Sequence, residues 1–200
     1  MIDAALMFKV FQDCRGDALV IPGRGAHHWA SISEQPNRDI PLGDPAMGGH
    51  AAYALGLALA RPDQKVVLFD SEGDLLMNLG VLATIADQQP ANLYHFLLDN
   101  ECYATTGGQP VPNATLVDYA MIAKGAGYPA AYAFDDLDAL AKDMKQIVEQ
   151  PGPVFVAMKI IPEVENLPIG LRQRRKRRDR REVMRTVQEE LGVQVTVTAN

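Results

Sequence analysis

The sequence has few cysteines and no long apolar run. Its two cysteines, Cys14 and Cys102, provide neither a disulfide framework nor a paired spacing for zinc, which favours a reducing compartment. No apolar stretch is long enough to cross a bilayer, and the first residues lack a basic segment followed by an apolar core and a cleavage site. We therefore expect a cytoplasmic protein without a membrane partner.

The composition is that of a globular domain. The chain has 200 residues, of which 48% are hydrophobic and 22% are charged, enough to bury a sizeable core. The net charge of −6 is unevenly distributed, because residues 172–185 hold nine of the 19 basic residues and two of the 25 acidic ones. The rest of the chain, with ten basic and 23 acidic residues, carries −13. We expect one domain over residues 1–170 and a basic helix or tail over residues 171–200.

The basic run Arg172–Arg181 reads RQRRKRRDRR and allows three interpretations. It can bind nucleic acid by neutralising phosphates, form a solvated helix, or dock on an acidic subunit. No aromatic residues interleave with these arginines, and the acidic body would repel a polyanion. Nucleic acid is therefore not the expected partner, and the other two interpretations stay open.

Short apolar segments alternate with segments of helical periodicity along most of the chain. The predicted strands are residues 18–21, 66–69, 93–98, 129–134 and 154–160. The predicted helices are residues 49–60, 75–87, 116–125, 135–149 and 179–191. Residues 193–200 alternate like a strand but also suit a disordered tail. This order predicts a three-layer α/β/α fold with a mostly parallel sheet of about six strands.

Polar side chains follow two of these strands. Glu72 comes shortly after the strand at 66–69, and Asn100 follows the strand at 93–98. The carboxyl ends of parallel strands are the usual place for a cofactor. Carboxylate and carboxamide oxygens are hard ligands that suit Mg²⁺ holding a phosphorylated cofactor.

Four short motifs together resemble a known enzyme family. They are Met47-Gly48, the segment SEGDLLMNLG over residues 71–80, Asp99-Asn100, and TTGGQ over residues 105–109. In this order they resemble the diphosphate-binding domain of thiamine-diphosphate-dependent 2-oxoacid decarboxylases, above all those acting on sulfopyruvate and phosphonopyruvate. The resemblance covers about residues 15–160, and it implies thiamine diphosphate and Mg²⁺ as cofactors.

The resemblance also implies a set of metal ligands. These are the Glu72 carboxylate, the Asn100 side-chain oxygen and the backbone carbonyl of Cys102. The chain departs from the family motif Gly-Asp-Gly, which here is Ser71-Glu72-Gly73, so the ligand is longer by one methylene. Asp74 follows where a small hydroxyl residue is common, and we expect it to cap the helix, with a place among the metal ligands as the alternative.

Further cofactor contacts follow from the same resemblance. A bulky apolar residue, here Met47, would lie under the cofactor and bend its two rings together, and Thr105 and Thr106 would face the reacting carbon as candidate catalytic hydroxyls. Arg24 and His27 are candidates for binding a second anionic group of the substrate. The full set of implied cofactor-binding residues is Gly25, Ala26, His27, Pro45, Met47, Gly73, Asp74, Asn100, Cys102 and Tyr103.

The resemblance implies that the site is shared with another chain. In these enzymes a glutamate of a separate pyrimidine-binding domain activates the cofactor, and 200 residues leave no room for that domain here. We expect a hetero-oligomer in which a partner supplies it, and a carboxy-lyase reaction on a small 2-oxoacid. A carboligase subunit similar to acetolactate synthase and a non-catalytic cofactor-binding relic are the alternatives.

Overall fold

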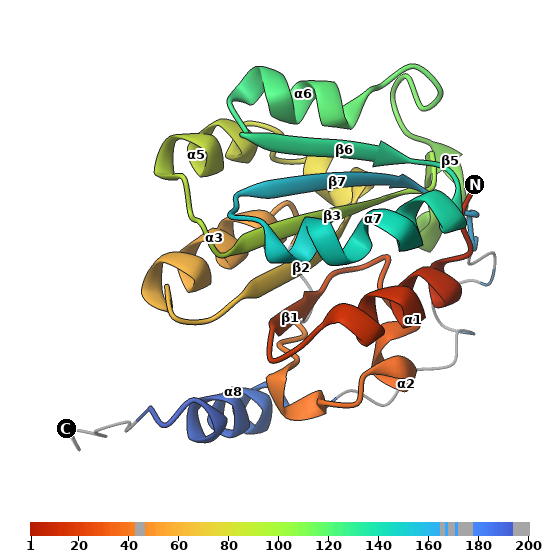
Figure 1. Cartoon of the computed structure of the whole chain (residues 1–200). Coiled ribbons are helices and arrows are strands. Elements are labelled where there is room, and N and C mark those ends of the chain that lie inside the picture. The colour runs from red at the N-terminus through yellow and green to blue at the C-terminus, as the bar shows by residue number, and fades with distance from the viewer. Residues whose placement is uncertain (43–46, 165–166, 168–170, 172–177, 194–200) are drawn as a thin grey trace.

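A parallel sheet forms the centre of the computed structural model, which describes residues 1–42, 47–164, 167, 171 and 178–193 (Figure 1). Five strands lie in the order β1-β2-β3-β7-β6, and every neighbouring pair is parallel. The strands are β1 (Leu19–Pro22), β2 (Val66–Ser71), β3 (Leu93–Asp99), β6 (Ala130–Phe134) and β7 (Val154–Lys159). A small antiparallel pair, β4 (Cys102–Tyr103) and β5 (Gln109–Pro110), lies apart from this sheet.

Helices cover both faces of the sheet (Figure 1). One face carries α1 (Ala4–Cys14), α2 (Trp29–Ile32) and α7 (Leu137–Glu149). The other carries α3 (His50–Ala60), α5 (Val81–Gln88) and α6 (Tyr119–Ala126), with α4 (Glu72–Leu76) directly after β2. The predicted three-layer α/β/α fold is confirmed. The main sheet has five strands in the described residues, where the sequence predicted about six.

Aromatic packing fixes the α1 face of the sheet. Phe8 and Phe11 of α1 meet Phe69 of β2 edge-on, with ring centroids 4.8 and 5.0 Å apart. Trp29 of α2 joins the same cluster at 5.4 Å from Phe69. Such tilted and edge-to-face contacts add to the free energy gained by burial. They hold α1 and α2 rigidly against the strand that leads into the Glu72 turn.

Helices α1 and α2 were not predicted, and the segment predicted as one helix at 75–87 differs from the prediction. Asp3 caps α1 by accepting from the Leu6 amide at 2.9 Å. The helix predicted at 75–87 is divided into α4 and α5 by a turn at residues 77–80. Apolar periodicity continues through the turn, which is why the sequence pattern did not show it. Asn78 in this turn donates to the Gly48 carbonyl at 3.1 Å, so the break ties the turn to the start of α3.

The last described helix, α8 (Arg180–Glu190), packs back on the domain. Val183 and Val187 are buried, and Arg178 donates to the Pro36 carbonyl at 2.6 Å beside the short 3₁₀ helix η1 (Pro36–Arg38). This confirms the helix predicted at 179–191. Residues 172–177 of the basic run and 194–200 of the terminal segment lie outside the described residues, and a domain boundary at residue 170 stays a prediction.

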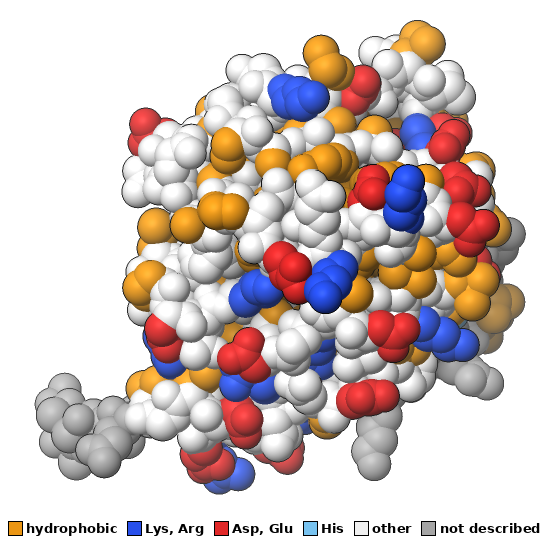
Figure 2. All heavy atoms as spheres, in the orientation of Figure 1, with side chains coloured by type: hydrophobic (Ala, Val, Ile, Leu, Met, Phe, Trp, Pro, Cys, Tyr) orange, Lys and Arg blue, Asp and Glu red, His pale blue; other side chains and the backbone are white. Residues whose placement is uncertain are grey.

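Helix length and the distribution of surface charge relate to the predictions about membranes and nucleic acids. None of the helices within the described ranges is long and apolar enough to cross a membrane. On the face that carries α1 and α7, acidic and basic side chains are interspersed among apolar ones (Figure 2). This face therefore has no single-sign field that would attract a polyanion.

Gly23 directly follows β1, and the backbone of β2 lies so close to it that there is no room for a side chain. Its amide donates to the Phe69 carbonyl at 2.7 Å, and a Cβ at this position would lie 2.4 Å from that oxygen. We expect Gly23→Ala to lower the free energy of unfolding by about 1–3 kcal/mol, measured by urea denaturation. Gly56→Ala in α3 is the matched control, because a Cβ added there would have no heavy atom of a neighbouring segment within 4 Å. It should be neutral or stabilising by up to about 1 kcal/mol. Equal effects of the two changes would contradict this account.

Candidate functional site

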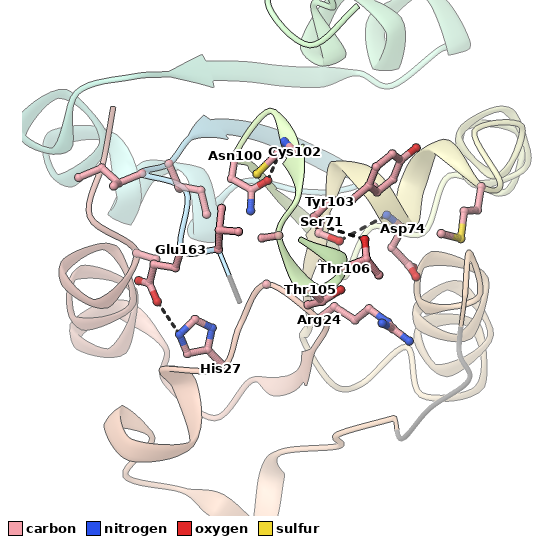
Figure 3. A pocket seen from close by; sticks show the side chains of 18 of the residues that line it. Arg24, His27, Ser71, Asp74, Asn100, Cys102, Tyr103, Thr105, Thr106 and Glu163 are labelled. Atoms are coloured by element: carbon pink, nitrogen blue, oxygen red, sulfur yellow. Dashed lines mark hydrogen bonds and ion pairs between the residues drawn. The ribbon is translucent and has the colours of Figure 1, made fainter. Parts of the chain in front are cut away.

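A pocket of about 400 Å³ opens at the carboxyl ends of the sheet strands (Figure 3). Its walls come from the segments that follow β1, β2, β3 and β7. These four strands are neighbours in the parallel sheet, so their carboxyl ends meet at one edge. The pocket has the size of a small-molecule site.

Glu72 is the first residue of α4 and is fully buried; its chain neighbours Ser71 and Gly73 line the pocket, whereas Glu72 itself does not. Its Oε1 accepts a hydrogen bond from the Cys102 amide at 3.1 Å, whereas its Oε2 has no hydrogen-bond partner among the described residues. Burial, with a smaller contribution from the nearby Asp99 charge, raises the pKa of Glu72 to about 7. A buried carboxyl oxygen without a partner calls for a proton or a cation.

Asn100 provides the second oxygen at the same point. Its Oδ1 also accepts from the Cys102 amide, at 3.1 Å, so one N–H group draws the Asn100 and Glu72 oxygens together. Two hard oxygens, one of them on a carboxylate with an unsatisfied oxygen, suit Mg²⁺. Glu72, Asn100 and the Cys102 carbonyl would therefore hold the metal and, through it, a diphosphate. Their assignment as ligands stays a prediction.

Asp74 does not cap its own helix, and that expectation is wrong. Ser71 caps α4 by accepting from the Asp74 amide at 3.3 Å. Asp74 is the third residue of the helix, and its side chain points to the start of α3 instead: Oδ1 accepts from the Gly48 amide at 2.9 Å and Oδ2 lies 2.8 Å from Nδ1 of His50. The extra carboxylate is thus tied to the start of α3.

His50 offsets the negative charge of Asp74. Burial lowers the pKa of His50, but the hydrogen bond and charge of Asp74, with the charge of Asp70, outweigh it and leave that pKa above its ordinary value. Burial raises the pKa of Asp74, but the hydrogen bonds from His50 and Gly48 outweigh it and lower that pKa overall. These opposite shifts favour the buried ion pair between protonated His50 and the Asp74 carboxylate. Sequence reasoning missed His50, whose only signal was a polar residue at the start of an apolar helix.

Most of the predicted cofactor-binding and catalytic residues line the pocket. Ala26 does not, because its side chain is in the core and its amide donates to the Gly23 carbonyl at 3.1 Å. Pro45 lies outside the described residues. The predicted residues that line the pocket are Gly25, His27, Met47, Gly73, Asp74, Asn100, Cys102, Tyr103, Thr105 and Thr106.

The turn with the two threonines is held by local hydrogen bonds. Thr106, in the 3₁₀ helix η2 (Ala104–Thr106), donates from its hydroxyl to the Tyr103 carbonyl at 3.2 Å. Gln109 donates to the Thr106 carbonyl at 2.9 Å. Gly107 has a φ of 113°, which a residue with a side chain adopts only at a cost. The turn therefore presents Thr105 and Thr106 to the pocket on a defined backbone.

The segment after β7 contributes residues that the sequence motifs did not indicate. Ile161, Glu163 and Val164 line the pocket, and no motif precedes or contains them. Arg24, expected as an anion-binding residue, lines it from the loop after β1 (Figure 3). Only the parallel pairing of β7 with β3 brings these distant segments to one cavity.

Comparison with known proteins agrees with this geometry. Residues 25–158 match the family model described as thiamine pyrophosphate enzyme, C-terminal TPP binding domain. The chain belongs to this family. It is 37% identical over 155 residues to sulfopyruvate decarboxylase subunit beta of Methanothermobacter thermautotrophicus, a match that covers 76% of this chain and 79% of that protein.

Other relatives of this TPP-binding chain are longer. Phosphonopyruvate decarboxylase of Streptomyces viridochromogenes is 32% identical over 160 residues, which cover 79% of this chain and 39% of that protein. The solved structure of a thiamine diphosphate-dependent 4-hydroxybenzoylformate decarboxylase from Rhodococcus jostii has a TM-score of 0.63 at 16% identity, covering 81% of this chain and 33% of that one. This last likeness shows the fold alone.

The raised pKa of Glu72 predicts a pH-dependent stability. With a folded-state pKa of about 7, above its ordinary 4.5, Glu72 binds its proton more tightly in the folded state. The contribution of Glu72 to the free energy of unfolding is therefore fully present below about pH 4.5 and is lost as the pH rises through about 7. Between pH 5 and pH 8 this group should lower the free energy of unfolding of the wild type by up to about 3 kcal/mol, and Glu72→Gln should not show this decrease. Urea denaturation without metal ions measures both proteins. If Glu72→Gln had the same pH dependence of stability as the wild type, Glu72 would not be its cause.

The His50–Asp74 ion pair predicts coupled effects on stability. His50→Ala leaves a buried carboxylate without its cationic partner and should lower the free energy of unfolding by about 3–5 kcal/mol. Adding Asp74→Ser, which places a small hydroxyl there, should recover part of this loss because it removes the carboxylate that His50→Ala leaves without its partner. Urea denaturation of both single variants and the double variant gives the coupling energy. Strictly additive effects would show that the pair is not an interacting unit.

Proposed function

We propose that this chain is the diphosphate-binding subunit of a thiamine-diphosphate-dependent decarboxylase that acts on a small acidic 2-oxoacid such as sulfopyruvate or phosphonopyruvate. The observation that carries the proposal is the buried Glu72 carboxylate, whose second oxygen has no partner among the described residues, beside Asn100 at the pocket floor. The similarity to sulfopyruvate decarboxylase subunit beta over 79% of its length supports the substrate class.

Each part of the pocket has a proposed role. Glu72, Asn100 and the Cys102 carbonyl hold Mg²⁺, and the loop at Gly25 and the turn at Gly73 admit the diphosphate. Thiamine diphosphate, when bound, supplies the ring that accepts the electron pair as CO₂ leaves a 2-oxoacid. This chain's own residues bind the cofactor, orient the substrate and exclude water from the pocket.

The substrate end of the pocket is built from different residues. Thr105 and Thr106 orient the substrate carboxylate or hold a proton near it. Arg24 provides positive charge, and His27 provides a further N–H donor, for a second anionic group of the substrate. Met47, which also lines the pocket, provides the apolar support under the cofactor.

The proposal includes a partner chain and a location. A pyrimidine-binding subunit provides the activating glutamate and completes the cofactor site, so catalysis requires a hetero-oligomer. The beta-subunit names of the sulfopyruvate decarboxylase relatives support this arrangement. We further propose residues 1–170 as the cofactor-binding domain and the cytoplasm as the location.

The test is turnover by the chain purified together with its pyrimidine-binding partner. With thiamine diphosphate and Mg²⁺ present, we expect CO₂ release from sulfopyruvate or phosphonopyruvate. Cofactor binding without turnover of any 2-oxoacid would favour a non-catalytic relic, and acetolactate formation from pyruvate would favour a carboligase. Absence of both cofactor binding and turnover would refute the proposal.

Glu72→Ala should lower kcat by at least about a hundredfold, because it removes a metal ligand from the site. Glu72→Asp, which restores the residue common in the family, should keep measurable activity. Glu149→Ala on the exposed side of α7 is the control and should leave kcat unchanged. Retention of full activity by Glu72→Ala would show that the metal lies elsewhere.

A further inference from the structure

Two consecutive histidines and one distant glutamate meet at the mouth of the pocket. His27 and His28 belong to the loop after β1, and Glu163 belongs to the segment after β7. Nε2 of His27 lies 2.7 Å from Oε2 of Glu163, and Nε2 of His28 lies 2.7 Å from Oε1 of the same carboxylate. The two imidazole rings lie side by side, with centroids 4.0 Å apart.

Both imidazoles therefore direct Nε2 to the same carboxylate, each to a different oxygen. An ion pair with a single carboxylate needs only one protonated histidine, and two protonated rings this close would repel each other. Neutral imidazoles, by contrast, present a nitrogen lone pair, and two of them with a carboxylate form a common ligand set of Zn²⁺ and related ions. The metal-ligating atoms of the three side chains all lie within 4.8 Å of one another.

We propose that His27, His28 and Glu163 form a binding site for a divalent transition-metal ion of the Zn²⁺ or Co²⁺ type. Metal–ligand distances of about 2.0–2.2 Å require ligand atoms about 3.0 Å apart at octahedral angles and about 3.4 Å apart at tetrahedral angles. The 2.7 Å nitrogen–oxygen separations therefore need to open by about 0.3 to 0.7 Å, which rotation of partly exposed side chains accommodates. The three side chains are 24%, 32% and 44% exposed, so an ion can reach them from solvent.

This site differs in chemistry from the proposed magnesium site. Imidazole nitrogens favour Zn²⁺, Co²⁺ or Ni²⁺, whereas the all-oxygen set of Glu72 and Asn100 favours Mg²⁺. In Figure 3, His27 and Glu163 lie on another side of the pocket from Asn100 and Cys102. The two sets of ligands share no residue.

Three protein ligands leave at least one coordination position open. Because His27 and Glu163 line the pocket, a bound ion would have the cavity beside it. An anionic oxygen of a molecule in the pocket is the ligand that fits such a position. The ion would also join the segment after β7 to the loop after β1.

The test is a Co²⁺ titration of the tag-free full chain, followed by visible absorption, with excess Mg²⁺ and no thiamine diphosphate. We expect one Co²⁺ per chain. His28→Gln and Glu163→Gln should each weaken binding by at least about tenfold, since loss even of outer partners of a metal ligand costs that much. Glu149→Gln is the matched control and should bind Co²⁺ as the wild type does.

Other outcomes would overturn the proposal. No Co²⁺ binding up to millimolar concentration would mean that the three side chains form only an ion-paired contact. Binding that survives both His28→Gln and Glu163→Gln but is lost in His50→Gln would place the ion in the buried cluster of His50, Asp70 and Asp74. Circular dichroism of each variant shows that it is folded. Because the titration contains no thiamine diphosphate and measures no turnover, its result is independent of the proposed decarboxylase function.

Discussion

The parallel pairing of β1, β2, β3 and β7 is the constraint on which the site depends. Its register places Ser71 beside Leu98 and Asp99 beside Lys159, so the turns that follow these strands begin at one level. The strands that carry them are buried on both faces, and a slip of one residue would exchange the two apolar faces of each strand. The free energy of core packing thus holds the pocket residues in place, although they lie far apart in the chain.

The buried carboxylates of Asp99 and Asp74 at the carboxyl edge of this sheet have cationic partners, whereas that of Glu72 has none among the described residues. Lys159 lies 2.8 Å from Asp99, and His50 lies 2.8 Å from Asp74, so each of these carboxylates has a cationic partner. Glu72 has no cationic partner among the described residues, and its Oε2 has no hydrogen-bond partner there. An acidic group in such a place is either protonated or bound to a cation, and this connects the stability of the chain to metal binding.

The sequence was a good guide to strands and a weaker one to helix ends and long-range partners. Each of β2, β3 and β7 begins where its apolar run begins. The turn at Asn78 was not predicted, because a turn whose flanking residues keep the helical period leaves the pattern unchanged. Helix α1 was not predicted, although Asp3 is a typical N-cap residue and the spacing of Phe8 and Phe11 is typical of one helix face. Motifs found Glu72 and Asn100, whereas Glu163 belongs to no motif, since its role depends on contacts across the fold.

The sequence by itself determined the fold class, the family and the residues at the strand ends, because apolar periodicity and motif spacing are local properties of a chain. Only the tertiary structure decided what those residues touch. It joined Asp74 to His50 and left Oε2 of Glu72 without a partner among the described residues. It also brought Glu163 to His28, 135 positions away in the chain, and to the preceding His27. The physical reason is that hydrogen bonds and charge interactions act over a few ångströms in space, and the sequence does not contain those distances.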